Sequence, residues 1–202
     1  MPFRILVEKR GIQRYFVPLL AVWTVLVLAS VGWNLYANHQ DTIGKARVEA
    51  RTILEHNLAY RRWNSMQGGV YAQLSEHNQP NPYLPVEFRD IESGTGMALT
   101  LINPFRMTKQ AYELLREHSP TLAAVTRTVS LQPVNPDNAP DDWEQAALHA
   151  FEEGVTEVTE ITEIDNQPYL RLLAPYITEE ECLKCHGWQG YQVGDIRGGM
   201  SI

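Results

Sequence analysis

Residues 156–177 read TEVTEITEIDNQPYLRLLAPYI. Two runs rich in β-branched, aromatic and aliphatic residues, 156–164 and 169–177, flank the turn-forming residues Asp165, Asn166 and Gln167. Extended runs of this kind, separated by a short polar turn, are typical of two antiparallel strands. The stretch therefore predicts a β-hairpin, and with it a sheet as the centre of the fold.

The segments on either side of the hairpin predict further strands and short helices. Strands are expected at 70–74, 98–102 and 126–132, with a last strand beginning at Gly198. Asn103 followed by Pro104 is typical of a helix start, and the helix is expected to run to about residue 117. Another helix, 143–153, is expected between Asp141 or Asp142 and Gly154. This order predicts an α+β fold with a mainly antiparallel sheet and flanking helices.

Both cysteines of the chain lie just after the hairpin, in Cys182-Leu183-Lys184-Cys185-His186. The acidic residues 179–181 before them favour the N-terminal end of a helical turn, so the motif is expected on such a turn. Cys-x-x-Cys-His is the attachment signal for c-type haem. The two thiols add across the haem vinyl groups, and the histidine is placed to become an axial ligand of the iron. The motif therefore predicts one covalently bound haem c.

Other chemistry for the cysteine pair is less well supported. A structural zinc site usually takes four ligands from two such pairs, and the chain has no second pair. A thioredoxin-like redox pair is expected near a βαβ pattern in a reducing compartment. A disulfide between residues three positions apart closes a very small loop and stabilises little.

The N-terminal region predicts a membrane anchor. No Lys, Arg, Asp or Glu occurs between Tyr15 and Gln40, and 16–36 is long enough to cross a bilayer as a helix. Basic residues dominate 1–15, which predicts that this end is cytoplasmic. The expected location is a bacterial inner membrane, with 37–202 in the periplasm. A cleaved signal peptide is the open alternative, although its apolar run would normally be shorter. Residues 41–64 are expected to continue the span as a long helical stalk, through which two copies could form a homodimer.

Charge and composition narrow the function further. The 202-residue chain has a net charge of −7, and because residues 1–15 contribute +3, the remainder carries −10. Such acidity argues against nucleic acid as a partner, since nucleic-acid-binding domains present basic patches. No nucleophile and base occur at a meaningful spacing, so the chain is not expected to be an enzyme.

Several short motifs, in this order along the chain, resemble the Tll0287-like haem-binding family over residues 40–202. They are Arg61-Arg62-Trp63-Asn64, Gly68-Gly69-Val70-Tyr71, Pro80-Asn81-Pro82-Tyr83, Leu101-Ile102-Asn103-Pro104, Asn138-Ala139-Pro140, Pro168-Tyr169-Leu170-Arg171-Leu172, the cysteine motif, and Gly194-Asp195-Ile196-Arg197-Gly198-Gly199. The resemblance implies a PAS-like fold with one haem c attached through Cys182 and Cys185, and with His186 as the axial ligand. Domains of this family occur alone or as periplasmic input regions of histidine kinases, cyclases and chemoreceptors.

The second axial position of the iron is open at this stage. Met66 is the first candidate and His56 the second, because methionine and histidine both serve as haem ligands. A vacant or water-bound position is equally open, and ordinary packing or solvation is the commoner fate of both residue types. Candidates for contacting the haem propionates, by paired hydrogen bonds from a guanidinium, are Arg61, Arg62, Arg171 and Arg197. Aromatic candidates for walling the haem, or for ordinary core packing, are Trp63, Tyr71, Tyr83 and Trp188.

The function expected from these features is a periplasmic sensor of redox state or of NO, CO or O₂, forming the input region of a signalling protein. An output domain after Ile202 belongs to that expectation. A membrane-anchored electron-transfer cytochrome without an output is the alternative, and a structural module stapled by haem is a third. The expected partners are the membrane, the haem c maturation machinery, and a small gas or a redox protein.

Overall fold

The structure is a computed structural model that describes residues 9–119, 124–164 and 166–202. By its internal contacts the chain divides into two compact units, Met1–Ala46 and Arg47–Ile202. The first eight residues of the predicted basic N-terminus, and Asp165 of the predicted hairpin turn, lie outside the described residues.

Helix α1 (Lys9–Met66) contains most of the first unit and the beginning of the second. The predicted span and the predicted long helix are therefore one uninterrupted helix. In the part of the chain that the structure describes, it is the helix long and apolar enough to cross a membrane, with a mean hydropathy of 2.1 in its most apolar window. Large apolar side chains from Tyr15 to Tyr36 are exposed, as a lipid-facing segment requires.

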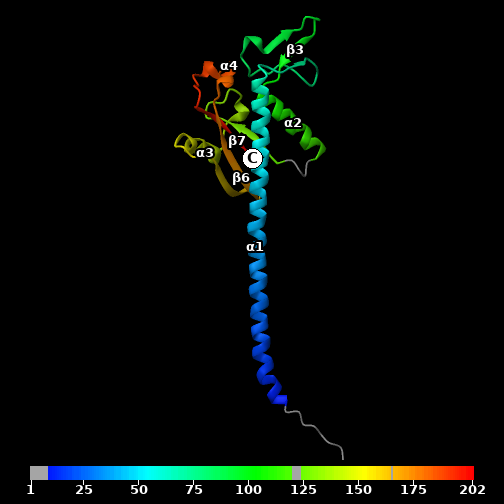
Figure 1. Ribbon diagram of the computed structural model, residues 1–202, viewed down its shortest axis with the longest axis vertical. Coiled ribbons are helices and arrows are strands. Elements are labelled where there is room, and N and C mark those ends of the chain that lie inside the picture. Colours follow the sequence, from blue (N-terminus) through cyan, green and yellow to red (C-terminus); the bar gives the residue numbers. More distant parts are fainter. Residues whose placement is uncertain (1–8, 120–123, 165) are drawn as a thin grey trace, which may run out of the picture. The chain divides into compact units, whose positions relative to one another are not determined.

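The second unit is α+β with antiparallel pairing, which confirms the predicted fold class (Figure 1). One sheet has the order β4-β7-β6-β5, from β4 (Arg127–Val129), β7 (Ile196–Ser201), β6 (Gln167–Ile177) and β5 (Val158–Ile164). A smaller sheet has the order β1-β3-β2, from β1 (Tyr71–Gln73), β3 (Ala98–Leu101) and β2 (Asp90–Glu92). The predicted hairpin is β5–β6, with Leu172 opposite Thr159 and with Asn166 at a positive φ of 59°.

The middle of strand β6 is buried on both faces. Leu172 and Tyr176 pack with α1 residues such as Leu54. Leu173, one position along, packs against α3 (Asp142–Glu152) through Leu148. Since successive side chains of a strand point to opposite faces, α1 covers one face of the larger sheet and α3 the other.

Both predicted helix starts are confirmed by their caps. The side chain of Asn103 accepts a hydrogen bond from Arg106 N at the start of α2 (Pro104–His118). Asp141 and Glu144 form a capping box at the start of α3. These side chains satisfy backbone N–H groups that a first helical turn leaves unpaired, which is why local sequence located both starts.

Three short elements separate β6 from β7. They are η3 (Glu180–Cys182), α4 (Leu183–His186) and η4 (Gly187–Gln189). The predicted helical turn carrying the cysteine motif is thus present, and it extends one turn further than expected. The remaining one-turn elements are η1 (Glu87–Arg89) and η2 (Pro136–Asn138).

Strand β7 passes very close to β4 because it contains glycine. A Cβ placed on Gly198, whose φ is +148°, would lie 2.3 Å from the carbonyl oxygen of Val129. No side chain fits at that separation, so glycine is required there.

Candidate functional site

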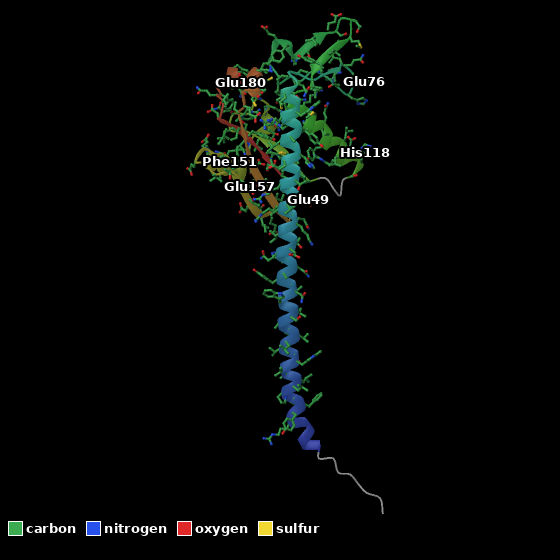
Figure 2. All side chains as sticks on the ribbon, in the orientation of Figure 1. Glu49, Glu76, His118, Phe151, Glu157 and Glu180 are labelled. Carbon is green, nitrogen blue, oxygen red and sulfur yellow. The ribbon has the colours of Figure 1, made fainter. Side chains whose placement is uncertain are left out.

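The cysteine motif is held between the ends of two neighbouring strands. Thr178, just after β6, donates its backbone N–H to Asp195 O (2.8 Å) and accepts from Gly194 N (2.9 Å). Glu180, labelled in Figure 2, begins the helical turn that follows. These two bonds join the end of β6 to the residues just before β7, so the segment from η3 to η4 forms a loop closed at its base.

Both cysteines are free thiols and both are partly buried. The sulfur of Cys182 accepts a hydrogen bond from Glu179 N at 3.4 Å. Burial raises the pKa of Cys185, against the opposing effect of the Arg197 charge. The thiols thus lie one helical turn apart, sheltered but not cross-linked.

His186 is held from both sides of its ring. Its Nδ1 lies 2.7 Å from Gln189 Oε1, and its Nε2 lies 2.9 Å from a guanidinium nitrogen of Arg197. Because a guanidinium only donates, Nε2 must accept, and the ring proton must lie on Nδ1 and be donated to Gln189. Burial lowers the pKa of His186, and the nearby Arg197 charge lowers it further. The neutral imidazole, with its lone pair on Nε2, is the form that ligates a metal.

Two arginines flank Tyr176 beside this histidine. Arg61, only 8% exposed, donates to the Tyr176 hydroxyl at 2.5 Å and to Thr128 Oγ1 at 3.2 Å. The guanidinium of Arg61 also stacks over the Tyr176 ring at 4.0 Å, and that of Arg197 lies 5.8 Å from the same ring. The Nε of Arg197 is buried and has no hydrogen-bond partner among the described residues. Burial lowers the pKa of Arg61, and Arg197 adds to the effect.

A cavity of about 110 Å³ opens beside His186. Its lining includes Arg61, Tyr83, Tyr176, Gln189 and Arg197. Three of the predicted site residues, His186, Arg61 and Arg197, are therefore brought together around one space.

The other predicted arginines lie elsewhere. Arg62 is exposed and lies 3.7 Å from Glu179, at the start of the cysteine turn. Arg171 is not brought to the cavity, because it forms ion pairs with Asp141 and Glu144 and stacks over Trp143. The charge of Arg171 is thus neutralised by the two acidic residues that cap α3, and no bound ligand is needed to pair it.

The two candidates for the second axial position are not among the residues that line this cavity. Met66 ends α1 and is 67% exposed. His56 is also exposed, with its ring 6.4 Å from that of Tyr60. Their role as ligands stays a prediction.

The four aromatic candidates divide in the same way. Tyr83 lines the cavity, and Trp188 donates its indole N–H to Cys185 O while remaining exposed. Tyr71 donates its hydroxyl to Phe88 O, and Trp63 is exposed.

Sequence reasoning missed Gln189 and Tyr176. Gln189 follows His186 by three positions in a helical segment, a spacing that places side chains side by side, so this signal was present. Tyr176 carried no local signal, since its partner Arg61 is 115 positions away.

The fold and the site define a class of protein, an antiparallel α+β domain that presents a Cys-x-x-Cys-His turn between two adjacent strands. The chain belongs to the Tll0287-like family, described as Tll0287. The model of this family matches residues 39–202. Among solved structures it is similar to the crystal structure of the cyanobacterial heme-protein Tll0287, with a TM-score of 0.51 and 14% identity. The match covers 78% of this chain and 92% of that chain, and at this identity it supports the fold. No curated protein matches the chain.

Proposed function

We propose that this chain is a membrane-anchored haem protein that carries one haem c on Cys182 and Cys185, with His186 as an axial ligand, and acts as a periplasmic redox or gas sensor. The observation that carries the proposal is the tautomer of His186: the ring proton is on Nδ1, toward Gln189, so Nε2 holds the lone pair that could ligate a metal once Arg197 releases it. Membership of a family that includes a solved haem protein supports it.

The residues present fit a covalent haem. Each thiol would add its S–H across one vinyl C=C bond, forming a thioether with no other reactant. The buried Nε of Arg197 and the buried guanidinium of Arg61 lack anionic partners among the described residues, and propionates would supply them. Bound haem would supply an iron that exchanges one electron or binds a small gas.

Arg197 would change partners when the histidine becomes a ligand. Nε2 has a single lone pair, so it cannot accept from Arg197 and ligate a metal together. Arg197 is therefore expected to release His186. Its charge lies beside Tyr176, which is hydrogen-bonded to Arg61 on α1.

This chain of contacts favours sensing over electron carriage. A change in charge or ligation at the histidine would act on Arg197, Tyr176 and Arg61, and Arg61 belongs to the same continuous helix as the apolar N-terminal segment. We propose that residues 1–15 are cytoplasmic, 16–36 span a bacterial inner membrane, and 37–202 are periplasmic. The proposed partners are the haem c maturation machinery, a small gas or a redox protein, and a second copy through the long helix.

One observation favours the alternative of an anchored electron carrier. Trp188, hydrogen-bonded to the cysteine turn, is an exposed aromatic residue at the site where an electron-transfer partner would dock. Exposed aromatic side chains are enriched at protein interfaces.

Absorption spectra of the oxidised and reduced full chain, with and without CO and NO, test the proposal. A sensor of gas should show a Soret shift on CO or NO addition. A redox sensor should instead titrate within the range of periplasmic redox pools. A spectrum indifferent to both gases, with a potential far outside that range, would contradict the sensor function and leave electron transfer or a structural role.

Gln189 is expected to position His186. Gln189→Leu removes the acceptor for Nδ1–H, so the ring loses its fixed tautomer and orientation while the thioethers stay intact. We expect the reduction potential of the haem to shift and the electron paramagnetic resonance lines to broaden. Gln189→Glu restores an acceptor and should recover narrow lines with a lower potential. Identical spectra for Gln189→Leu and the unaltered chain would contradict the positioning role.

A further inference from the structure

A second cavity in the unit Arg47–Ile202 has a volume of about 170 Å³. Residues of α1, α2, β4, β6 and β7 contribute to its lining, whereas His186 and the two cysteines do not. Cavities that hold drug-sized ligands measure about 300–1,000 Å³, so this one suits a smaller molecule. It shares Arg61, Thr128 and Tyr176 with the cavity beside His186, and Phe105, Asn135 and Asn138 as well.

Arg61 supplies a buried positive charge that no carboxylate neutralises. Its hydrogen bonds run from one terminal nitrogen to two hydroxyl groups, those of Tyr176 and Thr128. No acidic group lies within 4.0 Å of it in the described part of the chain. A buried charge is costly unless it is paired, so an anion beside Arg61 would be stabilising.

Tyr112 on α2 adds a second donor to the same lining. Its hydroxyl oxygen accepts from Asn57 Nδ2 at 2.6 Å, which leaves its own hydrogen available to donate. Burial raises the pKa of Tyr112, so the hydroxyl keeps that hydrogen at neutral pH. Arg61 and Tyr112 therefore both offer hydrogen-bond donors to this cavity.

The charged groups around the cavity have a positive balance. The four cationic lining residues are Arg61, Lys109, Arg116 and Arg127, and the two acidic ones are Glu113 and Asp137. Lys109 lies 3.9 Å from Glu113, and Arg127 is 3.3 Å from Glu144. This balance stands out in a chain whose net charge is −7, and a positive cavity attracts small anions.

We infer that this cavity binds a small carboxylate, with Arg61 and Tyr112 donating to the carboxylate oxygens and with Lys109 and Arg116 at its rim. A carboxylate matches the planar guanidinium, and the apolar side chains of Phe105 and Met200 in the lining suit a short carbon chain. The inference goes beyond the haem function, because the lining excludes the cysteine motif.

Calorimetric titration of the haem-loaded full chain in detergent tests the inference, with succinate and acetate as probes and the neutral diamide succinamide as the control ligand. We expect saturable binding of at least one carboxylate at one site per chain, and no binding of succinamide. Because Arg61 was also expected to contact a haem propionate, the two anions compete for it. An absence of carboxylate binding to haem-loaded protein would overturn the inference in favour of the propionate.

Variants away from the buried arginine locate the site. Tyr112→Phe should weaken the binding roughly tenfold, as expected for a lost hydrogen bond to a charged group. Arg116→Gln should weaken it roughly two- to fivefold, with the difference shrinking at high salt. Arg47→Gln is the matched control, because Arg47 is an exposed arginine on α1 outside the lining, and it should bind as the unaltered chain does.

Equal weakening by Arg47→Gln and Arg116→Gln, or binding of succinamide as tight as succinate, would overturn the inference. Haem attachment is read from the absorption spectrum of the same samples. Failure of the proposed haem function therefore appears as a missing spectrum, whereas failure of this inference appears as a missing binding isotherm.

Discussion

Replacing both Cys182 and Cys185 by alanine is expected to abolish covalent haem attachment. The two thiols are the chain's only cysteines, both are free, and they lie one helical turn apart beside His186. Without either thiol no thioether can form. Haem staining of a denaturing gel should fall from full intensity to background, and haem released from the protein should become extractable by acidified organic solvent.

Four further variants test this result in more detail. Each single alanine variant should retain haem through one thioether, with a red-shifted pyridine haemochrome because one vinyl group remains unsaturated. Lys184→Ala is the matched control, since it lies between the cysteines and carries no attaching atom, and it should stain normally. His186→Ala should keep covalent haem but change its spin state. Covalent haem in the double alanine variant would contradict the attachment site.

Phe151→Ala is expected to lower the free energy of unfolding by about 3–5 kcal/mol. Phe151, labelled on α3 in Figure 2, is 2% exposed and packs with Leu148, Leu173 and Val129. Its removal leaves a cavity between α3 and the larger sheet. Strand β6 of that sheet leads directly to the cysteine turn. Urea unfolding of the full chain in detergent, followed by circular dichroism, measures the loss.

Phe88→Ala provides the comparison, because Phe88 is 41% exposed and its loss removes less buried surface than the loss of Phe151. We expect it to lower the free energy of unfolding by only about 1–2 kcal/mol. A similar loss for both variants would show that the face of the sheet covered by α3 is not the main core. Loss of covalent haem in Phe151→Ala, without a change in unfolding, would contradict the packing account as well.

Local features of the sequence predicted most of the elements correctly. The β5–β6 hairpin follows from a strand-like pattern, and the starts of α2 and α3 follow from Asn103 and from Asp141, whose side chains bond to nearby backbone groups. Strand β2 was not predicted, because Asp90, Ile91 and Glu92 are too few to show a pattern. Its pairing with β3 depends on a neighbour that the local sequence does not contain.

The candidate site was predicted only in part for the same reason. Among the four arginines, nothing in the sequence distinguished Arg61 and Arg197 from Arg171. The structure separates them, since Arg171 is used by the acidic cap of α3 while Arg61 and Arg197 meet at Tyr176. Partners far apart along the chain can be recognised only once the strands and helices are packed.

The sequence by itself placed the two thiols and the imidazole together, because Cys182, Cys185 and His186 lie within five residues and need only one helical turn to come close. The tertiary structure decided what surrounds them. Antiparallel pairing sets Ile177 of β6 opposite Ile196 of β7, which brings Tyr176 near Arg197, and packing of α1 on that face adds Arg61. The environment of the histidine therefore depends on contacts between distant segments, and no short stretch of sequence contains them.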